Sequence, residues 1–329
     1  MNMAVETFGL AKAYKSVFAV DHIDLKVPAG SVCGFLGKNG AGKTTTLKML
    51  TGQKRPTAGE FAIMGKKKGF GAGVNIGESV GYLPDVPDFY GYMNGQEFLL
   101  LCGKLCGMAG GALREHVRSL LKQVNLNSVK TPIAGYSRGM RQRLGIAQAL
   151  INSPPVIFMD EPISALDPMG RRDVMEIISG INAGKSTTVV LSTHILSDVE
   201  SICDYVIIIH KGKVLIQDGM GDLKRRFAKN AAELEFYEEA HRIKFEQALK
   251  NTGKAEAVER DDPGVQLTTR VSPLNKNGES GEISGICAAV LAENAMPFKS
   301  FNMHAPSLDD IFHDAVDAAD KHKTGGARA

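Results

Sequence analysis

The sequence predicts an α/β fold with a parallel sheet at its core. Two runs, at 156–159 (VIFM) and 188–192 (TVVLS), are apolar or β-branched almost throughout, which is typical of parallel strands that are covered on both faces. A third strand-like run, SVCGFL at 31–36, leads into a glycine-rich segment and then into the helix-like run TLKML at 46–50. These runs indicate buried strands that are connected through helices.

The segments around these strands complete the predicted core. Residues 5–36 alternate between polar and apolar and carry a turn at 28–30, which predicts short antiparallel strands before the buried one. Residues 65–77 are predicted to form a loop, and residues 91–150 a mostly helical subdomain, in which apolar side chains along 113–124 share one helical face. The runs 206–209 and 213–216 flank a turn and predict a hairpin.

After about residue 228 the pattern predicts a small, separate domain. Strands are predicted near 232–236, 254–260, 265–271 and 298–303, and helices at 239–250 and 282–295. This β-α-β-β-α-β order indicates a ferredoxin-like α+β domain, with a turn at 261–264 between its middle strands. An amphipathic helix at 307–319 and a disordered tail follow. The predicted domains are therefore residues 1–227, 228–304 and 305–329.

Composition and charge bound the class of protein. The 329 residues carry a net charge of +3, which is too small to predict nucleic acid or a membrane surface as a partner. No apolar run approaches about 18 residues, the length at which a membrane-spanning helix is predicted. Five cysteines without paired spacing predict reduced thiols in a cytosolic protein.

The glycine-rich segment at 37–45 (GKNGAGKTT) predicts a phosphate site and a P-loop NTPase core. It fits the pattern G-x-x-x-x-G-K-[ST]. Glycine permits the backbone to turn its N–H groups toward phosphate oxygens, and the following helix adds its N-terminus. Lys43 would reach the β- and γ-phosphates of ATP, and Thr44 would bind Mg²⁺. The predicted phosphate-binding residues are Gly37, Lys38, Asn39, Gly40, Ala41, Gly42, Lys43, Thr44 and Thr45.

A second GKST, at 184–187, does not fit the same pattern. The required upstream glycine is replaced by Ser179, and a strand-like run follows in place of a helix. The segment is therefore predicted to be a turn before a strand.

Two acids close the apolar run at 156–159. Asp160, at the end of the predicted strand, suits the shell of a bound Mg²⁺, and Glu161 follows it directly. A carboxylate in that place can orient and deprotonate a water that attacks the γ-phosphate. The alternative is a surface acid pair that merely ends a strand.

These motifs together resemble the ATP-binding subunits of ATP-binding-cassette (ABC) transporters. Residues 37–44 match the family's phosphate loop, 136–140 (YSRGM) resemble its LSGGQ signature, and 156–161 match its Walker B strand with the adjoining glutamate. Residues 164–167 (SALD) match its D-loop, and 192–194 (STH) its switch histidine. The resemblance covers about residues 3–225, with the motifs in the family's order.

The resemblance implies roles for further residues. Glu161 would be the catalytic base, and His194 would hold both this base and the γ-phosphate. Tyr14 lies where the family carries an aromatic ring that stacks on adenine. The nucleotide-binding residues that the resemblance implies outside the loop are Tyr14, Ser137, Gly139 and Asp167.

Two departures from the family pattern affect the site. Asp85 stands where the family has the glutamine of its Q-loop, and we expect it to support catalysis and the Mg²⁺ shell. The signature keeps Ser137 and Gly139 but has Arg138 between them. These changes, and the closing segment 307–312 (SLDDIF), resemble the ATPase subunits of ABC-2-type exporters, a group that includes drug- and antibiotic-resistance pumps.

The resemblance also implies partners. In this family each ATP lies between the phosphate loop of one cassette and the signature of another, and this chain has one of each, so a head-to-tail homodimer is expected. Because no run spans a membrane, a separate ABC-2-type permease is implied, with this chain in the cytoplasm at the inner face of the membrane. The apolar-rich segment 86–93 (VPDFYGYM) is the predicted docking surface for that partner.

Two alternative functions stay open at this point. One is a soluble ABC ATPase that acts on a ribosome or on DNA, although such proteins usually carry two cassettes or a long coiled coil. The other is a regulatory module that binds ATP without useful turnover, which the altered Q-loop favours and the presence of Glu161 and His194 disfavours.

Overall fold

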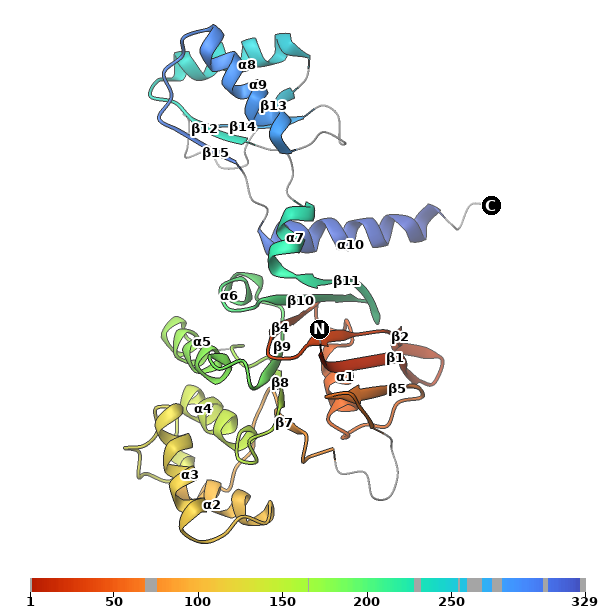
Figure 1. Ribbon diagram of the computed structural model, residues 1–329, viewed down its shortest axis with the longest axis vertical. Coiled ribbons are helices and arrows are strands. Elements are labelled where there is room, and N and C mark those ends of the chain that lie inside the picture. The colour runs from red at the N-terminus through yellow and green to blue at the C-terminus, as the bar shows by residue number, and fades with distance from the viewer. Residues whose placement is uncertain are drawn as a thin grey trace. The chain divides into compact units, whose positions relative to one another are not determined.

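The computed structural model describes residues 2–68, 76–164, 166–227, 232–253, 255–258, 268–273, 280–303 and 307–325 (Figure 1). The chain separates into two compact units. The first comprises Met1–Met220 together with Phe312–Ala329, and the second comprises Gly221–Ile311. Each unit has a hydrophobic core of its own.

A parallel sheet forms the centre of the first unit, as predicted. Five strands run parallel, in the spatial order β10-β4-β9-β8-β7, and β11 pairs antiparallel with β10 at one edge. Their side chains are buried on both faces in β4, β8 and β9, which explains why these runs are apolar without alternation. The strands are β4 (Val32–Leu36), β7 (Val80–Leu83), β8 (Val156–Asp160), β9 (Thr188–Thr193), β10 (Tyr205–His210) and β11 (Lys213–Gly219).

An antiparallel sheet packs beside the parallel one. Its order is β2-β1-β5-β6, and β3 also pairs with β1. The prediction of short strands is wrong for β1, which runs for 12 residues because register shifts let it pair with β2, β3 and β5 in turn. Its strands are β1 (Met3–Tyr14), β2 (Val17–Ile23), β3 (Lys26–Pro28), β5 (Ala58–Ile63) and β6 (Lys66–Lys68).

Strand β6 also corrects the predicted loop at 65–77. Lys66–Lys68 pairs with the end of β5, and its lysines are compatible with an edge strand because one of them, Lys67, forms an ion pair with Glu60 at 2.9 Å. The rest of the predicted loop, at 69–75, lies outside the described residues.

Helices cover the parallel sheet and form the predicted helical subdomain (Figure 1). Helix α2 starts with a capping box between Asn94 and Glu97, which satisfies two of its free N-terminal N–H groups. Helix α3 buries the predicted apolar face, including Leu113, Val117 and Leu120. The helices of the first unit are α1 (Lys43–Leu50), α2 (Gly95–Leu105), α3 (Gly110–Gln123), α4 (Arg138–Ala149), α5 (Pro168–Asn182) and α6 (Leu196–Glu200), with a 3₁₀ turn at Ile133–Gly135. Helix α7 (Met220–Phe227) follows them and, after its first residue, belongs to the second unit.

The second unit has the predicted β-α-β-β-α-β order. Its antiparallel sheet runs β13-β14-β12-β15, so the first strand along the chain lies between the third and the last, as in a ferredoxin-like fold. The predicted turn at 261–264 lies outside the described residues. The elements are β12 (Ala232–Glu235), α8 (Glu239–Thr252), β13 (Ala255–Val258), β14 (Thr268–Pro273), α9 (Ser280–Glu293) and β15 (Ser300–Met303).

The last helix, α10 (Leu308–Gly325), is longer than the predicted 307–319. It continues past residue 319 because Asp320 is anchored to the turn between β10 and β11. Residues 326–329 of the predicted tail lie outside the described residues. Over the described part of the chain, no helix combines the length and the hydrophobicity that crossing a membrane requires.

Candidate functional site

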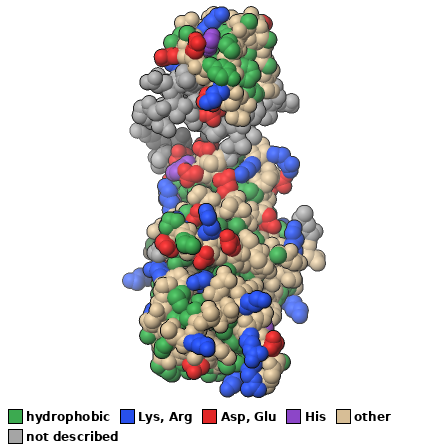
Figure 2. Space-filling model, turned by 90° about the vertical axis from the view of Figure 1, so that its left-hand side faces the viewer, with side chains coloured by type: hydrophobic (Ala, Val, Ile, Leu, Met, Phe, Trp, Pro, Cys, Tyr) green, Lys and Arg blue, Asp and Glu red, His purple; other side chains and the backbone are tan. Residues whose placement is uncertain are grey.

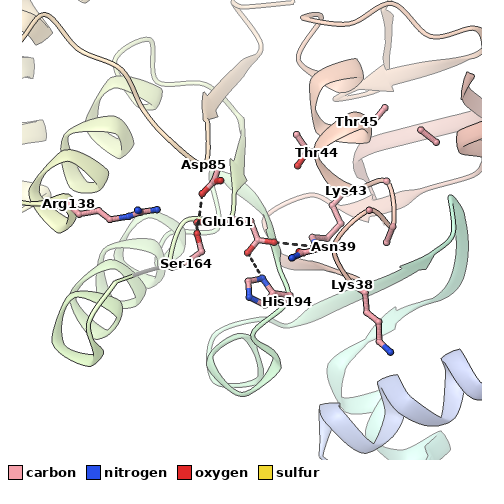
Figure 3. Close-up of a pocket in the computed structure, with 14 residues that line it drawn as sticks. Lys38, Asn39, Lys43, Thr44, Thr45, Asp85, Arg138, Glu161, Ser164 and His194 are labelled. Carbon is pink, nitrogen blue, oxygen red and sulfur yellow. Dashed lines mark hydrogen bonds and ion pairs between the residues drawn. The ribbon is translucent and has the colours of Figure 1, made fainter. Parts of the chain in front are cut away.

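A pocket of about 600 Å³ lies between the glycine-rich loop before α1 and the ends of β7, β8 and β9 (Figure 3). It brings together segments that lie far apart in the sequence: the loop, Asp85 after β7, Glu161 after β8 and His194 after β9. The lining residues are Ala19, Lys38, Asn39, Gly40, Ala41, Gly42, Lys43, Thr44, Thr45, Asp85, Arg138, Glu161, Ser164 and His194.

The glycines of the loop are required by its geometry. Gly42 has a φ of 113°, which favours glycine over other residues, and a Cβ there would lie 2.6 Å from the carbonyl oxygen of Ala19. A Cβ on Gly37 would lie 2.5 Å from the carbonyl oxygen of Ile209. The Lys43 ammonium, only 6 % exposed, donates to the Gly37 carbonyl at 2.6 Å. The loop therefore curls around its own lysine, which it holds at the pocket.

Oxygen atoms converge on Asp160 beneath the loop. This carboxylate is 2 % exposed, and its Oδ1 accepts from Ser192 Oγ at 2.6 Å and from Thr44 Oγ1 at 3.1 Å. Carboxylate and hydroxyl oxygens are the ligands that Mg²⁺ prefers. Thr44 and Asp160, which the sequence predicts as metal ligands, thus lie together as a donor set that fits this ion.

Glu161 lies between two basic side chains (Figure 3). Its Oε1 is 3.2 Å from Lys43 Nζ, and its Oε2 is 2.9 Å from His194 Nδ1. The backbone at Glu161 has a φ of 49° and is held there by its N–H, which donates to the carbonyl oxygen and to Oγ of Ser192, each at 3.1 Å. Backbone in this region is uncommon for a residue other than glycine and clusters at functional sites.

Asp85 faces a different neighbour from the one that its predicted metal role suggests. Its Oδ1 accepts from Ser164 Oγ at 3.1 Å (Figure 3), so the carboxylate is tied to the 164–167 segment and is not hydrogen-bonded to Thr44 or Asp160. Arg138 points into the same pocket and has no hydrogen-bond or ion-pair partner within the described ranges. The side chains that close this end of the pocket are thus Asp85, Ser164 and Arg138.

Five predicted nucleotide-binding residues lie outside the pocket lining: Tyr14, Gly37, Ser137, Gly139 and Asp167. Ser137 and Asp167 cap helices: Ser137 Oγ accepts from Met140 N at 3.2 Å, and Asp167 Oδ1 accepts from Gly170 N at 3.0 Å. A Cβ on Gly139 would meet nothing within 4 Å, so space is open beside it. Tyr14, the last residue of β1, does not line the pocket but lies beside it, because its hydroxyl interacts with the side chain of Thr45, which does.

Two lysine side chains lie against the exposed ring of Tyr14. The side chain is 42 % exposed, Lys54 Nζ lies 4.9 Å and Lys12 Nζ 5.6 Å from the ring centroid, and Lys54 donates to the phenol oxygen at 2.6 Å. This hydrogen bond, followed by the charges of Lys54 and Lys12, lowers the pKa of Tyr14 although slight burial opposes it. The ring therefore does not pack inside the β-subdomain.

Sequence reasoning missed two polar residues of the site. Ser192 falls inside the predicted switch-histidine run, but its bonds to Asp160 and Glu161 follow only from the pairing of β9 with β8. Tyr82, on β7, has a buried hydroxyl without a partner within the described ranges. Burial, and then the charges of Asp160 and Asp85, raise the pKa of Tyr82. No local pattern marks either residue, because each role depends on a neighbouring strand.

Curated relatives match this chain over most of its length. The bacitracin transport ATP-binding protein BcrA of Bacillus licheniformis is 38% identical over 318 residues, which are 95% of this chain and 97% of BcrA. The daunorubicin/doxorubicin resistance ATP-binding protein DrrA of Streptomyces peucetius is 31% identical over 315 residues, which are 94% of this chain and 91% of DrrA. Both relatives therefore extend over the two units described above.

A family description and a solved structure agree with these relatives. The ABC transporter family matches residues 20–164. A solved ATP-binding subunit of an ABC transporter is similar with a TM-score of 0.60 and 29% identity, covering 68% of this chain and 93% of that chain. From the loop, the pocket and these similarities together, the chain belongs to the ABC transporter family, as one of its ATP-binding subunits.

Proposed function

We propose that this chain hydrolyses ATP to power an exporter whose membrane-spanning part is a separate subunit. The observation that carries the proposal is the convergence of Lys43, Glu161 and His194 in one pocket, directly beside the buried pair of Thr44 and Asp160. A phosphate-binding lysine, a carboxylate and a metal-binding oxygen pair are the parts that phosphoryl transfer to water requires.

The loop would bind the phosphates of ATP. Its residues 38–42 and the start of α1 line the pocket, and no acidic side chain occurs in the first turn of α1 to compete with an anion. Thr44 and Asp160 would hold Mg²⁺, which neutralises phosphate charge when it is bound.

Glu161 is the proposed base. It now pairs with Lys43 and His194. An arriving phosphate attracts Lys43, so the carboxylate loses that partner and is left beside His194. The Glu161 carboxylate can then accept the proton of a water that attacks the γ-phosphate, while His194 keeps the carboxylate oriented. The regulatory alternative, in which ATP is bound without turnover, does not explain why Glu161 lies between Lys43 and His194.

We also propose that two copies are needed for complete sites. Ser137 and Gly139 do not line the pocket of their own chain, and the space beside Gly139 is open. In a head-to-tail dimer, the exposed start of α4 with these residues can face the nucleotide of the partner copy.

The dimer has a direct test. With ATP, the Glu161→Gln variant should form a dimer that light scattering detects, because the nucleotide persists. Adding Ser137→Arg should abolish it by placing bulk and charge against the partner's nucleotide. An ATP-bound monomer of Glu161→Gln over a wide concentration range would contradict the shared site.

The segment 86–93 is the proposed docking surface for the permease. Val86, Tyr90 and Tyr92 are 71, 54 and 76 % exposed. In Figure 2, hydrophobic side chains reach the surface among Lys and Arg side chains in the lower part of the molecule, where Figure 1 places α2, α3 and α4. Phe89 and Tyr90 both approach Phe98 edge-on, at 5.1 and 6.5 Å between ring centres, and of the two Phe89 lies closer and is less exposed.

The names of BcrA and DrrA, a transport and a resistance protein, support an ABC-2-type exporter over a factor that acts on ribosomes or DNA. On this reading the chain lies in the cytoplasm, held at the inner face of the membrane by its permease.

Two measurements test the proposed function. Purified chain should hydrolyse ATP and stop when Mg²⁺ is chelated. Cross-linking in membranes should recover a transmembrane protein. If no ATP is turned over by the chain, alone or in membranes, the enzyme proposal fails. Recovery of ribosomal proteins in place of a membrane protein would refute the exporter.

A further inference from the structure

The turn between β10 and β11 supports the phosphate loop from behind. Gly212 N donates to the carbonyl oxygen of Ala41, in the loop, at 2.9 Å. The carbonyl oxygen of Ile209, just before the turn, lies so close to Gly37 that a Cβ there would be 2.5 Å away. The turn is itself tight, with φ of 47° at Lys211 and 79° at Gly212. A displacement of this turn would therefore move the backbone of the loop.

The same turn is held from outside by the last helix. Asp320 of α10 accepts from Lys211 Nζ at 2.7 Å and from His210 Nε2 at 3.1 Å, both through Oδ1. The His210 side chain is only 11 % exposed. These two bonds, with Lys211 the larger cause, lower the pKa of Asp320, so the carboxylate is charged at neutral pH. In Figure 1, α10 runs along β11.

A second carboxylate holds the other side of the turn. Asp21 N donates to the carbonyl oxygen of Gly212 at 2.8 Å, and Asp21 Oδ2 pairs with Lys213 Nζ at 3.3 Å. Asp21 belongs to β2, whereas Asp320 lies near the end of α10. The turn is thus bound on one side by Asp21 of β2 and on the other side by Asp320 of α10.

We propose that Asp320 is a positioning residue for ATP binding. Through His210 and Lys211 it sets the place of the turn, and through the bond from Gly212 to Ala41 the turn sets the place of the phosphate loop. The inference rests on the proposed ATP site at that loop. Asp320 does not line the pocket and does not contact the residues assigned to catalysis.

Helix α10 is shared between the two units, and Asp320 lies in the part that belongs to the first. Residues 308–311 of the helix belong to the second unit and residues 312–325 to the first.

The experiment compares two aspartates on the same helix. Asp320→Asn removes the charge that binds the turn, whereas Asp317→Asn removes the same charge from an exposed position one turn earlier. Both are made in the full chain carrying Glu161→Gln, so that ATP is not consumed during titration. Isothermal titration gives the Kd of Mg-ATP, hydrogen exchange is followed in peptides that cover 37–43, and melting is recorded for each protein.

We expect Asp320→Asn to raise the Kd for ATP about two- to fivefold, the range that a partly exposed ion pair can supply. Hydrogen exchange at the loop should become faster in Asp320→Asn. Asp317→Asn should keep the Kd and the exchange rate of the parent protein, and both variants should keep its melting temperature. Lys211→Gln should give a similar loss, and Lys211→Gln with Asp320→Asn no more than the larger single loss.

Three results would overturn the inference: parental affinity and exchange in Asp320→Asn, an equal loss in Asp317→Asn, or a lower melting temperature with parental affinity. If the parent itself fails to bind ATP, the proposed site fails instead, so the two failures are distinguishable.

Discussion

The two units of this chain differ in the use they make of buried polar groups. In the first unit, the two buried charged residues among those described lie at one place: Lys43 is 6 % and Asp160 2 % exposed, and Thr44 contacts Asp160 beside the lysine. In the second unit, the described core is apolar and is built around Phe236, Phe245 and Leu234, with Thr269 as its buried polar residue among those described. Burying a charge is costly unless it is paired.

This difference in buried charge indicates that the chemical reaction takes place in the first unit. The first unit accepts the cost of burial because each charge has a partner: Lys43 with Glu161, and Asp160 with Ser192 and Thr44. The second unit has an ordinary packed core, which predicts stability without turnover. Substitutions with four expected effects, on turnover, stability, assembly and adenine binding, test and sharpen this comparison.

The largest expected effect is on turnover, in the first unit. Glu161→Gln should lower the rate of ATP hydrolysis by about 10²–10⁴, the usual contribution of a general base. ATP binding should persist, because Lys43 and the loop are intact. Steady-state hydrolysis with binding measured in parallel checks this. A near wild-type rate would remove Glu161 from the mechanism.

The second effect is on stability, in the second unit. Phe245→Ala should cost about 3–5 kcal/mol, as for other buried rings that are truncated, because Phe245 is 0 % exposed and lies 5.3 Å from the Phe236 ring. The neighbouring Tyr237, 62 % exposed, provides Tyr237→Ala as the matched control. Proteolysis and melting are the measurements.

The same variant sharpens the comparison of the units. The rate of ATP hydrolysis at saturating ATP should stay close to wild type in Phe245→Ala, since the described lining of the pocket comes from the first unit. A large fall in that rate would show that the second unit takes part in turnover, and would contradict the assignment of turnover to the first unit alone.

The third effect is on assembly. Tyr90→Ala should weaken recovery of the transmembrane partner by about 2 kcal/mol, the scale of an interface hot spot, and leave melting unchanged. Phe89→Ala is the counterpart that should lower the melting temperature, because Phe89 is less exposed than Tyr90 and packs more closely on the buried Phe98, at 5.1 Å against 6.5 Å between ring centres. Equal melting losses in the two variants, with assembly intact, would place both rings in the core.

The smallest effect is at the adenine position. Tyr14→Ala should weaken ATP binding by about 1 kcal/mol, the scale of a base stacked on an aromatic ring. Tyr14→Phe should be nearly silent, although it loses the hydrogen bond from Lys54. Titration with ATP separates the two. If phenylalanine proves as harmful as alanine, the hydroxyl and its bond to Lys54 carry the effect, and stacking does not.

Much of the fold followed from local patterns. The loop at 37–45, the buried strands β8 and β9 and the ferredoxin-like order after residue 228 each depend on residues close in sequence. The lengths of β1 and α10 did not follow, because β1 is prolonged by register shifts and α10 by a contact with the distant turn at 210–211. Contacts between residues that lie far apart in the chain produce no periodic pattern in the sequence.

The sequence by itself determined the family, the phosphate loop and the two acids at the end of β8, because glycine conformations and strand hydrophobicity act over a few residues. Only the tertiary structure decided which side chains meet. It paired Lys43 with Glu161, tied Asp85 to Ser164, and brought Asp320 to His210, which lies 110 residues earlier. The physical reason is that a hydrogen bond needs atoms within about 3 Å, and the packing of whole sheets and helices sets that distance.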